Sequence, residues 1–457
     1  MNEKIFREYD IRGIADKDLT DSTVDSIAGS LGYLFTERGV KKISIGRDCR
    51  ESSPRIHSHL VEGILKSGIE VVDIGLVPTP LLYFSTFHLK LAGGIMITGS
   101  HNPPDQNGFK VCLGKGTLHG EDIQLVKKFA LNGQVHKGTG NMSTANVLPA
   151  YLETVLKSIP PKLQGIIVAV DSGNGMGGIV APLLYRKLGC EVIELHSQPD
   201  GKFPNHHPDP TLPENLKDLI EAVKKSNAQV GIAFDGDADR IGVVGPTGRI
   251  FFGDELLALY SRQILRHHPG ATIISEVKAS HRFYQDVEKH GGEAIMWKTG
   301  HSLIKAKMQE TGTLLAGEMS GHMFFNDRYF GYDDAVYAGA RLLEILSQEK
   351  KSPEELLADL PPSVSTPEIR VDCSDETKFQ VVEEARKKLI SMGLKVISID
   401  GARVEFEDGW GLVRASNTQA VLVFRFEASD EKRLKEIRDL LENTVKQVIK
   451  SATPDKN

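Results

Sequence analysis

Three stretches of this chain repeat, loosely, one order of elements: strands alternate with helices, and the last strand runs into a cluster of polar residues and glycine. The clearest copy has predicted strands at Ile166–Val170, Glu191–Leu195 and Gln229–Phe234, with helices between them. Such alternation predicts open, largely parallel or mixed sheets. The sequence therefore predicts an α/β protein that contains three similar mixed α/β domains.

The first and third copies follow the same pattern. The first has predicted strands at Lys42–Ile45, Glu70–Ile74 and Ile95–Ile97; the third has them at Ala271–Val277, Glu293–Trp297 and Thr313–Ala316. Each copy places its polar cluster after its last predicted strand. Three such strand ends that face one cleft would build a single site from three domains.

From Pro361 the pattern changes. Strands are predicted at Glu368–Val371, Lys395–Ile399, Arg403–Glu407 and Val421–Phe426, with helices at Lys378–Met392 and Glu431–Lys450. This mixture is typical of a small α+β domain, and 457 residues exceed what one core holds. We therefore divide the chain into domains at residues 1–148, 149–250, 251–361 and 362–457.

Composition excludes some classes of protein. The 55 basic and 61 acidic residues give a net charge of −6, which argues against nucleic acid as the main partner. The four cysteines are widely scattered, as in a reducing compartment. Neither a signal-peptide core nor a run of ~18 apolar residues is found, so we expect a cytoplasmic protein without a membrane partner.

The cluster of the first copy contains a serine with a suggestive neighbourhood. The strand Ile95–Ile97 ends in Thr98-Gly99-Ser100-His101-Asn102-Pro103. Ligands bind at the carboxyl ends of strands in α/β sheets, and a serine placed there can carry or transfer a group. The alternative is a turn that only reverses the chain. The segment Gly46-Arg47-Asp48 ends another strand and is either structural or in contact with the Ser100 loop.

The cluster of the second copy contains three alternating carboxylates, Asp235, Asp237 and Asp239. Alternate residues of an extended segment point the same way, so the three can converge on one hard cation. An EF-hand is excluded, because Arg240 stands where its glycine would be and Pro246 where its glutamate would be. Open coordination favours magnesium completed by a phosphate oxygen, which Arg240 could also meet. The alternative is a solvated acidic turn.

Two further clusters offer groups for a sugar and a phosphate. Glu318 and Ser320 alternate, with His322 on the same side, and a carboxylate beside a hydroxyl suits vicinal sugar hydroxyls. The turn Arg414-Ala415-Ser416-Asn417-Thr418, with Arg425 on the next strand, would form a phosphate cradle. The alternatives are a strand end and a plain hairpin turn.

Scattered cationic and aromatic residues complete the set of candidates. Tyr9 and Arg12 could face a cleft, or belong to a floppy N-terminus. Lys278 and the segment Lys298-Thr299-Gly300-His301 end two strands of the third copy. A lysine or histidine there could serve as a base or contact a phosphate. Together these clusters predict phosphoryl transfer on a phosphosugar.

These four loops, in this order, resemble the α-D-phosphohexomutase superfamily. The matching segments are the phosphoserine loop Thr98–Pro103, the metal loop Asp235–Arg240, the sugar loop Gly317–His322 and the phosphate loop Arg414–Thr418. Met319 favours the phosphomannomutase/phosphoglucomutase branch, since the glucosamine-6-phosphate branch usually has glutamine there. The resemblance implies a C-terminal domain of TATA-box-binding-protein-like fold.

The resemblance also implies a mechanism. Phosphorylated Ser100 would pass its phosphoryl group to a hexose phosphate, and the resulting 1,6-bisphosphate would turn around and return the other one. Mg²⁺ would bind Asp235, Asp237, Asp239 and the Ser100 phosphate, and glucose or mannose 1,6-bisphosphate would act as activator. The implied catalytic residues are Ser100, His101, Lys110, Lys278 and Arg240. The implied substrate-binding residues are Tyr9, Arg12, Lys298, His301, Glu318, Ser320, His322, Arg414, Ser416, Asn417, Thr418 and Arg425.

We therefore expect an isomerase that moves a phosphoryl group between the 1- and 6-positions of mannose and glucose phosphates. Two alternatives stay open: a phosphoglucosamine mutase, and a non-catalytic phosphosugar-binding protein. The expected partner is a hexose phosphate, and we expect a monomer, with a dimer as the alternative.

Overall fold

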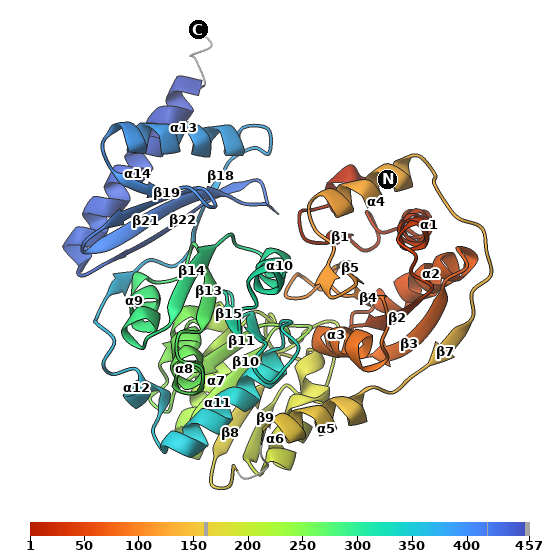
Figure 1. Cartoon of the computed structure of the whole chain (residues 1–457), viewed down its shortest axis with the longest axis horizontal. Helices are drawn as coiled ribbons and strands as arrows, with labels where there is room; N and C mark the ends of the chain where they lie inside the picture. Colours follow the sequence, from red (N-terminus) through yellow and green to blue (C-terminus); the bar gives the residue numbers. More distant parts are fainter. Residues whose placement is uncertain (160–162, 418, 453–457) are drawn as a thin grey trace.

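The computed structural model describes residues 1–159, 163–417 and 419–452. Their strands form four sheets, one for each predicted domain, and Figure 1 shows the fourth unit, in blue, at the opposite side of the molecule from the first helices. No helix within the described ranges is long and apolar enough to cross a membrane.

The first three units share one strand topology. In each, the first of the three predicted strands lies between the other two in parallel register, and a further strand runs antiparallel to the third. The orders are β3-β2-β4-β5 (Glu70–Leu76, Lys42–Arg47, Gly93–Ile97, Gln106–Leu113), β9-β8-β10-β11 (Glu191–Leu195, Ile167–Asp171, Val230–Phe234, Ile241–Val244) and β14-β13-β15-β16 (Glu293–Trp297, Thr272–Glu276, Leu315–Gly317, Met323–Phe325). The sequence predicted the three parallel strands of each unit but missed the antiparallel fourth. Each polar cluster is therefore the turn of a hairpin.

The elements of the first unit are η1 (Glu3–Ile5), β1 (Ile11–Ile14), α1 (Asp21–Glu37), β2 (Lys42–Arg47), α2 (Ser53–Lys66), β3 (Glu70–Leu76), α3 (Thr79–His88), β4 (Gly93–Ile97), β5 (Gln106–Leu113), β6 (Gly116–Thr117), α4 (Glu121–Leu131) and β7 (Met142–Thr144). Strand β4 is buried along its whole length, because helices cover both faces of the sheet. The N-terminal strand β1 pairs with β5, so the chain start is part of the sheet.

The second unit contains α5 (Leu148–Ser158), β8 (Ile167–Asp171), η2 (Met176–Ile179), α6 (Ala181–Leu188), β9 (Glu191–Leu195), η3 (Pro213–Leu216), α7 (Lys217–Ser226), β10 (Val230–Phe234), β11 (Ile241–Val244) and β12 (Ile250–Phe251). The third contains α8 (Gly253–His267), β13 (Thr272–Glu276), α9 (His281–Lys289), β14 (Glu293–Trp297), α10 (His301–Thr311), β15 (Leu315–Gly317), β16 (Met323–Phe325), α11 (Ala335–Glu349) and α12 (Pro353–Leu356).

The fourth unit is an antiparallel sheet covered by two helices. It contains β17 (Val364–Ser365), β18 (Ile369–Asp372), α13 (Lys378–Ser391), β19 (Lys395–Ile397), β20 (Ala402–Phe406), β21 (Gly409–Ala415), β22 (Val421–Ala428) and α14 (Glu431–Ala452). This confirms the predicted α+β domain. Strand β21 was not predicted, because Gly409 and Gly411 occupy positions where strands usually have β-branched or aromatic residues. A side chain at Gly409 would come within 2.4 Å of the Glu427 carbonyl, so glycine is required by close packing.

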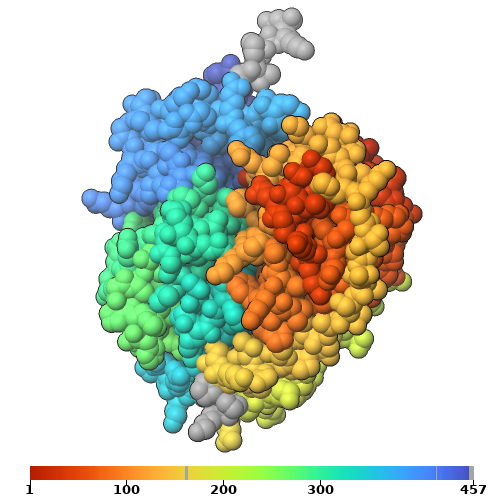
Figure 2. Space-filling view, turned by 45° about the vertical axis from the view of Figure 1, so that its right-hand side comes forward, coloured from red at the N-terminus to blue at the C-terminus, as the bar shows by residue number. Residues whose placement is uncertain are grey.

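One apolar core joins the first three units. It contains residues of α3, α5, α6, α8 and α11, whereas the fourth unit has a separate core between its sheet and helices. The first three units are therefore held together by apolar packing, and a smaller apolar cluster of Val277, Trp410 and Leu412 attaches the fourth unit to the third. Figure 2 shows the blue fourth unit packed beside the first and third units.

Candidate active site

The Ser100 loop joins β4 to β5 and is held from behind by a buried arginine. The Ser100 backbone has φ 51°, in the left-handed region that a non-glycine residue rarely adopts. The Ser100 amide donates to Thr98 Oγ1 at 2.8 Å. Arg50 donates to the carbonyls of Ser100 and Asn102 at 2.7 Å and of Gln106 at 2.9 Å. The loop conformation is therefore imposed by these contacts.

Asp48 completes this support. Its Oδ2 accepts from Arg50 Nε at 3.2 Å and from the Gly99 amide at 3.1 Å. A β-carbon on Gly99 would lie 2.4 Å from the Arg50 guanidinium, so only glycine fits. Of the two alternatives left open for the segment Gly46–Asp48, the contact with the Ser100 loop is therefore the one found. Arg50 was not predicted as a functional residue, because the sequence around it does not show which groups its guanidinium binds.

The three carboxylates of the second unit converge, but not for the reason that the sequence suggested. The segment is a turn with Ala238 at φ 59°, rather than an extended strand. Asp235 Oδ1 accepts from the amides of Asp239 and Arg240, both at 3.1 Å, which curls the chain around that carboxylate. All three carboxylates are fully buried, with ligand oxygens within 4.8 Å of one another.

This turn meets the Ser100 loop directly. Ser100 Oγ donates to Asp235 Oδ2 at 2.7 Å, and Lys110 on β5 donates to Asp237 at 2.8 Å and also to Asp239. Among the described residues, Oδ1 of Asp237 and Oδ1 of Asp239 find no hydrogen-bond partner. Three buried carboxylates with one ammonium and two unsatisfied oxygens fit a divalent cation bound by oxygen ligands.

The charges of this cluster shift one another's pKa values. Burial, reinforced by Asp237 and Asp239, raises the pKa of Asp235. Burial acts in the same direction on Asp237, but Lys110 outweighs it and lowers the Asp237 pKa. Burial would lower the pKa of Lys110, yet Asp237 and Asp239 raise it, so Lys110 stays charged. His101, whose Nδ1 lies 3.3 Å from Ser100 Oγ, has its pKa lowered by burial and by Arg240.

A buried histidine connects this turn to the sugar loop. Arg240 Nε donates to His322 Nε2 at 3.0 Å, and His322 Nδ1 lies 3.2 Å from Asp333 Oδ2. Lys305 donates to the other oxygen of Asp333 at 2.7 Å. Burial and the Lys305 charge lower the pKa of the neighbouring His301, which is therefore neutral near pH 7. Sequence reasoning missed Asp333 and Lys305, which lie outside any recognisable pattern.

Glu318 is buried at the third hairpin. Its Oε1 accepts from the Gly300 amide at 2.7 Å, and burial raises its pKa. Ser320, two residues on, is half-buried. Because residues 319 and 320 form a turn, the alternation seen in the sequence does not define a common face. His322 contacts Arg240 and Asp333 instead.

The fourth unit reaches the same region through Tyr9. Tyr9 Oη donates to the Thr299 carbonyl at 2.7 Å and accepts from Asn417 Nδ2 at 2.6 Å. Asp400 accepts from Arg414 Nε at 3.0 Å and from the Thr299 amide at 3.1 Å. The alternative of a flexible N-terminus is therefore wrong, because Tyr9 joins the first, third and fourth units.

The remaining predicted substrate-binding residues do not lie together in one place. Arg12 donates to Asn102 in the Ser100 loop at 3.0 Å. Arg425 donates to the Lys278 carbonyl at 2.5 Å. Ser416 follows β21, and Lys298 is exposed. Thr418 lies outside the described residues.

Lys278 is held between two glutamates. Its Nζ lies 3.2 Å from Glu368 Oε2 and 3.8 Å from Glu276 Oε1. Burial would lower the Lys278 pKa, but Glu276 and Glu368 raise it. The Lys278 charge lowers the pKa of Glu368 to about 2. Glu368, in the fourth unit, was not singled out from the sequence and positions Lys278 across the junction between units.

Glu368→Gln is expected to destabilise the attachment of the fourth unit in a pH-dependent way. The folded-state pKa of Glu368, about 2, lies below its usual 4.5, so its contribution is complete above pH 4.5 and is lost as pH falls toward 2. At pH 7 we expect a loss of about 1–2 kcal/mol in unfolding free energy, measured by chemical denaturation.

Exposed Glu384, replaced by glutamine, provides the matched control and is expected to change stability by under ~0.5 kcal/mol. A stability difference for Glu368→Gln that stayed constant from pH 7 down to pH 3 would contradict the assignment.

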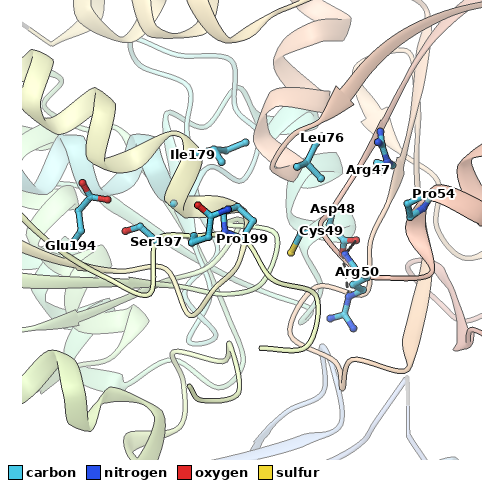
Figure 3. A pocket seen from close by; sticks show the side chains of 12 residues that line it. Arg47, Asp48, Cys49, Arg50, Pro54, Leu76, Ile179, Glu194, Ser197 and Pro199 are labelled. Carbon is cyan, nitrogen blue, oxygen red and sulfur yellow. Dashed lines mark hydrogen bonds and ion pairs between the residues drawn. The ribbon is translucent and has the colours of Figure 1, made fainter. Parts of the chain in front are cut away.

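A cavity of about 620 Å³ lies behind the Ser100 loop, between the first and second units. Figure 3 shows Arg47, Asp48 and Cys49 on one side of it and Ile179 and Ser197 on the other. None of the predicted catalytic or metal-binding residues lines this cavity. Ser100 and the three aspartates lie at hairpin turns and not in this cavity.

Comparisons with known proteins cover the whole chain. Family models described as phosphoglucomutase/phosphomannomutase alpha/beta/alpha domains I, II and III match residues 3–134, 149–248 and 252–364, and the model of the C-terminal domain matches 368–444. A phosphomannomutase/phosphoglucomutase of Pseudomonas aeruginosa is 46% identical over 97% of this chain and 96% of its own length. A phosphoglucomutase of Neisseria gonorrhoeae is 48% identical over 99% and 98%.

A solved structure gives the same result for the fold. It is a phosphoglucomutase/phosphomannomutase family protein of Burkholderia thailandensis, 42% identical, with a TM-score of 0.92 over 100% of this chain and 99% of that one.

Proposed function

The chain belongs to the α-D-phosphohexomutase superfamily, and from that premise we propose that it interconverts the 1- and 6-phosphates of mannose and glucose. It is an isomerase that works by reversible phosphoryl transfer. The observation that carries the proposal is the 2.7 Å hydrogen bond from Ser100 Oγ to Asp235, because it places a strained serine at a buried carboxylate cluster.

Ser100, once phosphorylated, is proposed to give its phosphoryl group to the free hydroxyl of the sugar phosphate. The P–Oγ bond breaks, a bond from phosphorus to the sugar oxygen forms, and the hydroxyl proton passes to a base. The 1,6-bisphosphate then turns around, and Ser100 takes the other phosphoryl group. Added glucose or mannose 1,6-bisphosphate would phosphorylate Ser100 and so act as activator.

Asp235, Asp237 and Asp239 are proposed to hold Mg²⁺ together with the Ser100 phosphate. Bound there, the ion would stabilise negative charge on the transferring phosphoryl group. The two unsatisfied oxygens of Asp237 and Asp239 support this proposal. Lys110 neutralises the same carboxylates and is placed to meet the phosphate as the serine reacts.

The distal groups of the sugar phosphate are assigned to the third and fourth units. Arg414, Ser416, Asn417 and Thr418, with Arg425, are proposed to hold the phosphate that does not react. Arg414 is oriented by Asp400, which supports this role. Glu318 and Ser320 are proposed to bind the 3- and 4-hydroxyls. Mannose and glucose differ at the 2-hydroxyl alone, so such a site accepts both.

Lys278 and the histidines are proposed to move the proton. Lys278 is proposed as a base, and because Glu276 and Glu368 raise its pKa it would begin the reaction protonated. The lowered pKa values of His101 and His301 leave both rings neutral and able to accept a proton. Arg240, Arg12, Tyr9, Lys298 and His322 are proposed to contact the substrate or its phosphates.

The experiment that tests this function compares kcat/KM on mannose 1-phosphate, glucose 1-phosphate and glucosamine 6-phosphate, with a trace of glucose 1,6-bisphosphate and Mg²⁺. We expect the first two values to lie within about 10-fold of each other and about 100-fold above the third. A higher value on glucosamine 6-phosphate would identify a phosphoglucosamine mutase. Sugar-phosphate binding without turnover, and without phosphate on Ser100 by intact mass, would identify a binding protein. A monomeric state, cytoplasmic location and the absence of a nucleic-acid partner stay predictions.

A further inference from the structure

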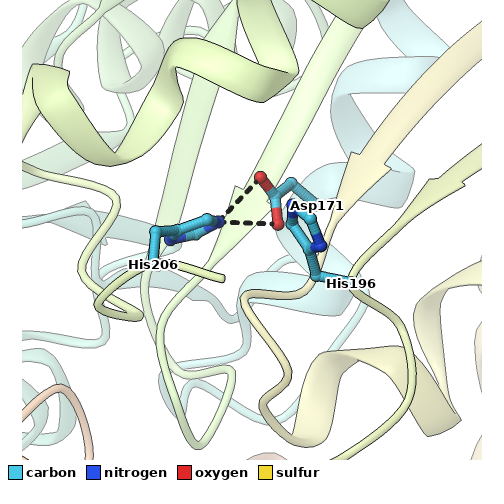
Figure 4. Close-up of side chains that lie close together, drawn as sticks. All are labelled: Asp171, His196 and His206. Atoms are coloured by element: carbon cyan, nitrogen blue, oxygen red, sulfur yellow. Dashed lines mark hydrogen bonds and ion pairs between the residues drawn. The ribbon is translucent and has the colours of Figure 1, made fainter. Parts of the chain in front are cut away.

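A second cluster of metal-ligating side chains lies on the second unit, outside the carboxylates described above. Asp171 ends β8, His196 directly follows β9, and His206 lies on the segment that leads to η3. Strands β8 and β9 are parallel, with Asp171 opposite Leu195, so His196 is adjacent to Asp171. Figure 4 shows the two rings on either side of the Asp171 carboxylate.

The three side chains form a compact set of ligand atoms. One ligand atom from each lies within 4.8 Å of the other two, and His206 Nε2 is 3.2 and 3.0 Å from the two oxygens of Asp171. In a tetrahedral site with bonds of ~2.0–2.1 Å, neighbouring ligand atoms are about 3.4 Å apart. Small side-chain rotations therefore suffice to close the set around one ion.

The hydrogen bonds around the rings leave lone pairs facing the carboxylate. His206 Nδ1 is 3.0 Å from the His207 carbonyl, which can only accept, so Nδ1 carries a proton. In the neutral ring, Nε2 then directs a lone pair at Asp171, and two acceptors face each other. Either a second proton or a metal cation must lie between them. A histidine that donates its other nitrogen to a carbonyl is typical of metal ligands.

His196 is oriented in a similar way. Its Nε2 is 3.0 Å from Oδ2 of Asp218, a carboxylate on α7 that accepts the ring proton and leaves Nδ1 with the lone pair. The Asp171 side chain is fully buried, whereas 19% of the His196 side chain and 15% of the His206 side chain are exposed. The set is thus anchored by a buried carboxylate on its inner side. On its outer side it is open to water, which can complete the coordination.

From this geometry we propose that Asp171, His196 and His206 bind a divalent transition-metal ion of the zinc class. Two imidazoles and one carboxylate suit Zn²⁺ or Co²⁺, whereas Mg²⁺ prefers oxygen ligands. The site therefore selects a different ion from the three-carboxylate turn, with which it shares no residue.

The bound ion would tie the segment after β9 to the end of β8. Asn174 already holds that segment, since its amide donates to the His196 carbonyl at 2.8 Å and its side chain donates to the Gln198 carbonyl at 2.9 Å. Cys49, which stands between the Asp48 and Arg50 that support the Ser100 loop, donates from its Sγ to the Asn174 carbonyl at 3.6 Å. The site is thereby coupled to the support of that loop and acts as a structural clamp on it.

The test uses the full chain in Mg²⁺-containing buffer and Co²⁺ as the probe, with Zn²⁺ in parallel. We expect about one Co²⁺ per chain with visible absorption typical of nitrogen-ligated cobalt, displaced by Zn²⁺, and a higher Tm with Zn²⁺. His196→Asn and His206→Gln are expected to weaken Co²⁺ binding about 100-fold or more. Asparagine suits position 196, because His196 has φ 49°.

Three controls separate the possible outcomes. Exposed His267, replaced by asparagine, is expected to bind Co²⁺ like the unaltered chain. Asp237→Asn is expected to retain the cobalt spectrum, which distinguishes this site from the carboxylate turn. His196→Asn is expected to keep mutase activity in Mg²⁺ within about twofold, which shows that it folds. Equal Co²⁺ affinity in the unaltered chain, His196→Asn and His206→Gln, or loss of the spectrum in Asp237→Asn, would overturn the proposal.

Discussion

Replacing Ser100 with alanine is expected to lower kcat of the mutase reaction by about 10⁴-fold or more. The hydroxyl that donates to Asp235 is the proposed carrier of the phosphoryl group, and alanine has no group that could take its place. Arg50 binds the backbone carbonyl and not the side chain, so the loop should persist in the variant. The coupled assay with glucose 1-phosphate and a trace of the 1,6-bisphosphate measures the loss.

Ser172→Ala provides the matched control. Ser172 is also fully buried, and its hydroxyl finds no hydrogen-bond partner among the described residues, so its removal should leave kcat within about threefold. Intact mass after incubation with glucose 1,6-bisphosphate should show one added phosphoryl group in the unaltered chain and in Ser172→Ala, and none in Ser100→Ala. Turnover by Ser100→Ala at the unaltered rate would exclude a phosphoserine mechanism.

The second large effect is expected for Asp237→Asn. Asp237 offers an unsatisfied oxygen to the proposed Mg²⁺ and accepts from Lys110 and from Thr79 Oγ1 through its other oxygen. Loss of this charge should raise the Mg²⁺ concentration for half-maximal activity at least 10-fold and lower kcat about 1,000-fold. Titration of activity with Mg²⁺ after treatment with a chelator measures both quantities.

Binding of the sugar phosphate separates this effect from unfolding. The proposed phosphate contacts of Arg414 and its loop do not involve Asp237, so calorimetry should find glucose 1-phosphate bound within about threefold of the unaltered affinity. Asp122→Asn removes a surface carboxylate paired with Arg38 and should change neither quantity. Full activity of Asp237→Asn at low Mg²⁺ would show that the carboxylate turn is not the metal site.

The strand and helix alternation was enough to predict three similar α/β units and a different fourth, because apolar periodicity reports directly on burial. It was not enough to find the antiparallel strands β5, β11 and β16. These follow turns rich in polar residues, and β16 has three residues, too few for a periodic signal. Strand β21 was missed for another reason, since its glycines are selected by the close approach of β22 and α14.

The candidate functional residues also divide into those that the sequence predicted and those that it did not. Ser100, the aspartates and Glu318 could be found, because each stands in a compact cluster with groups that suit one chemistry. Arg50, Asp333, Lys305 and Glu368 could not be found, because each binds a partner outside its own stretch of sequence. Arg50, for example, binds the Ser100 loop 50 residues later, and Glu368 pairs with Lys278 90 residues earlier.

The sequence by itself determined which chemical groups are available for the proposed site, because residue type fixes the hydroxyl, the three carboxylates and the guanidinium. It also determined the α/β class, through the spacing of apolar residues. Tertiary structure alone decided that Asp235, Asp237 and Asp239 converge through a turn closed on Asp235, and that Tyr9 joins three units. It also placed Asp171, His196 and His206 together. The contacts of Tyr9 depend on how separate units pack, and a contact over hundreds of residues leaves no local pattern. The two sets of metal-ligating side chains depend on how turns close within one unit, which spacing along the chain does not define.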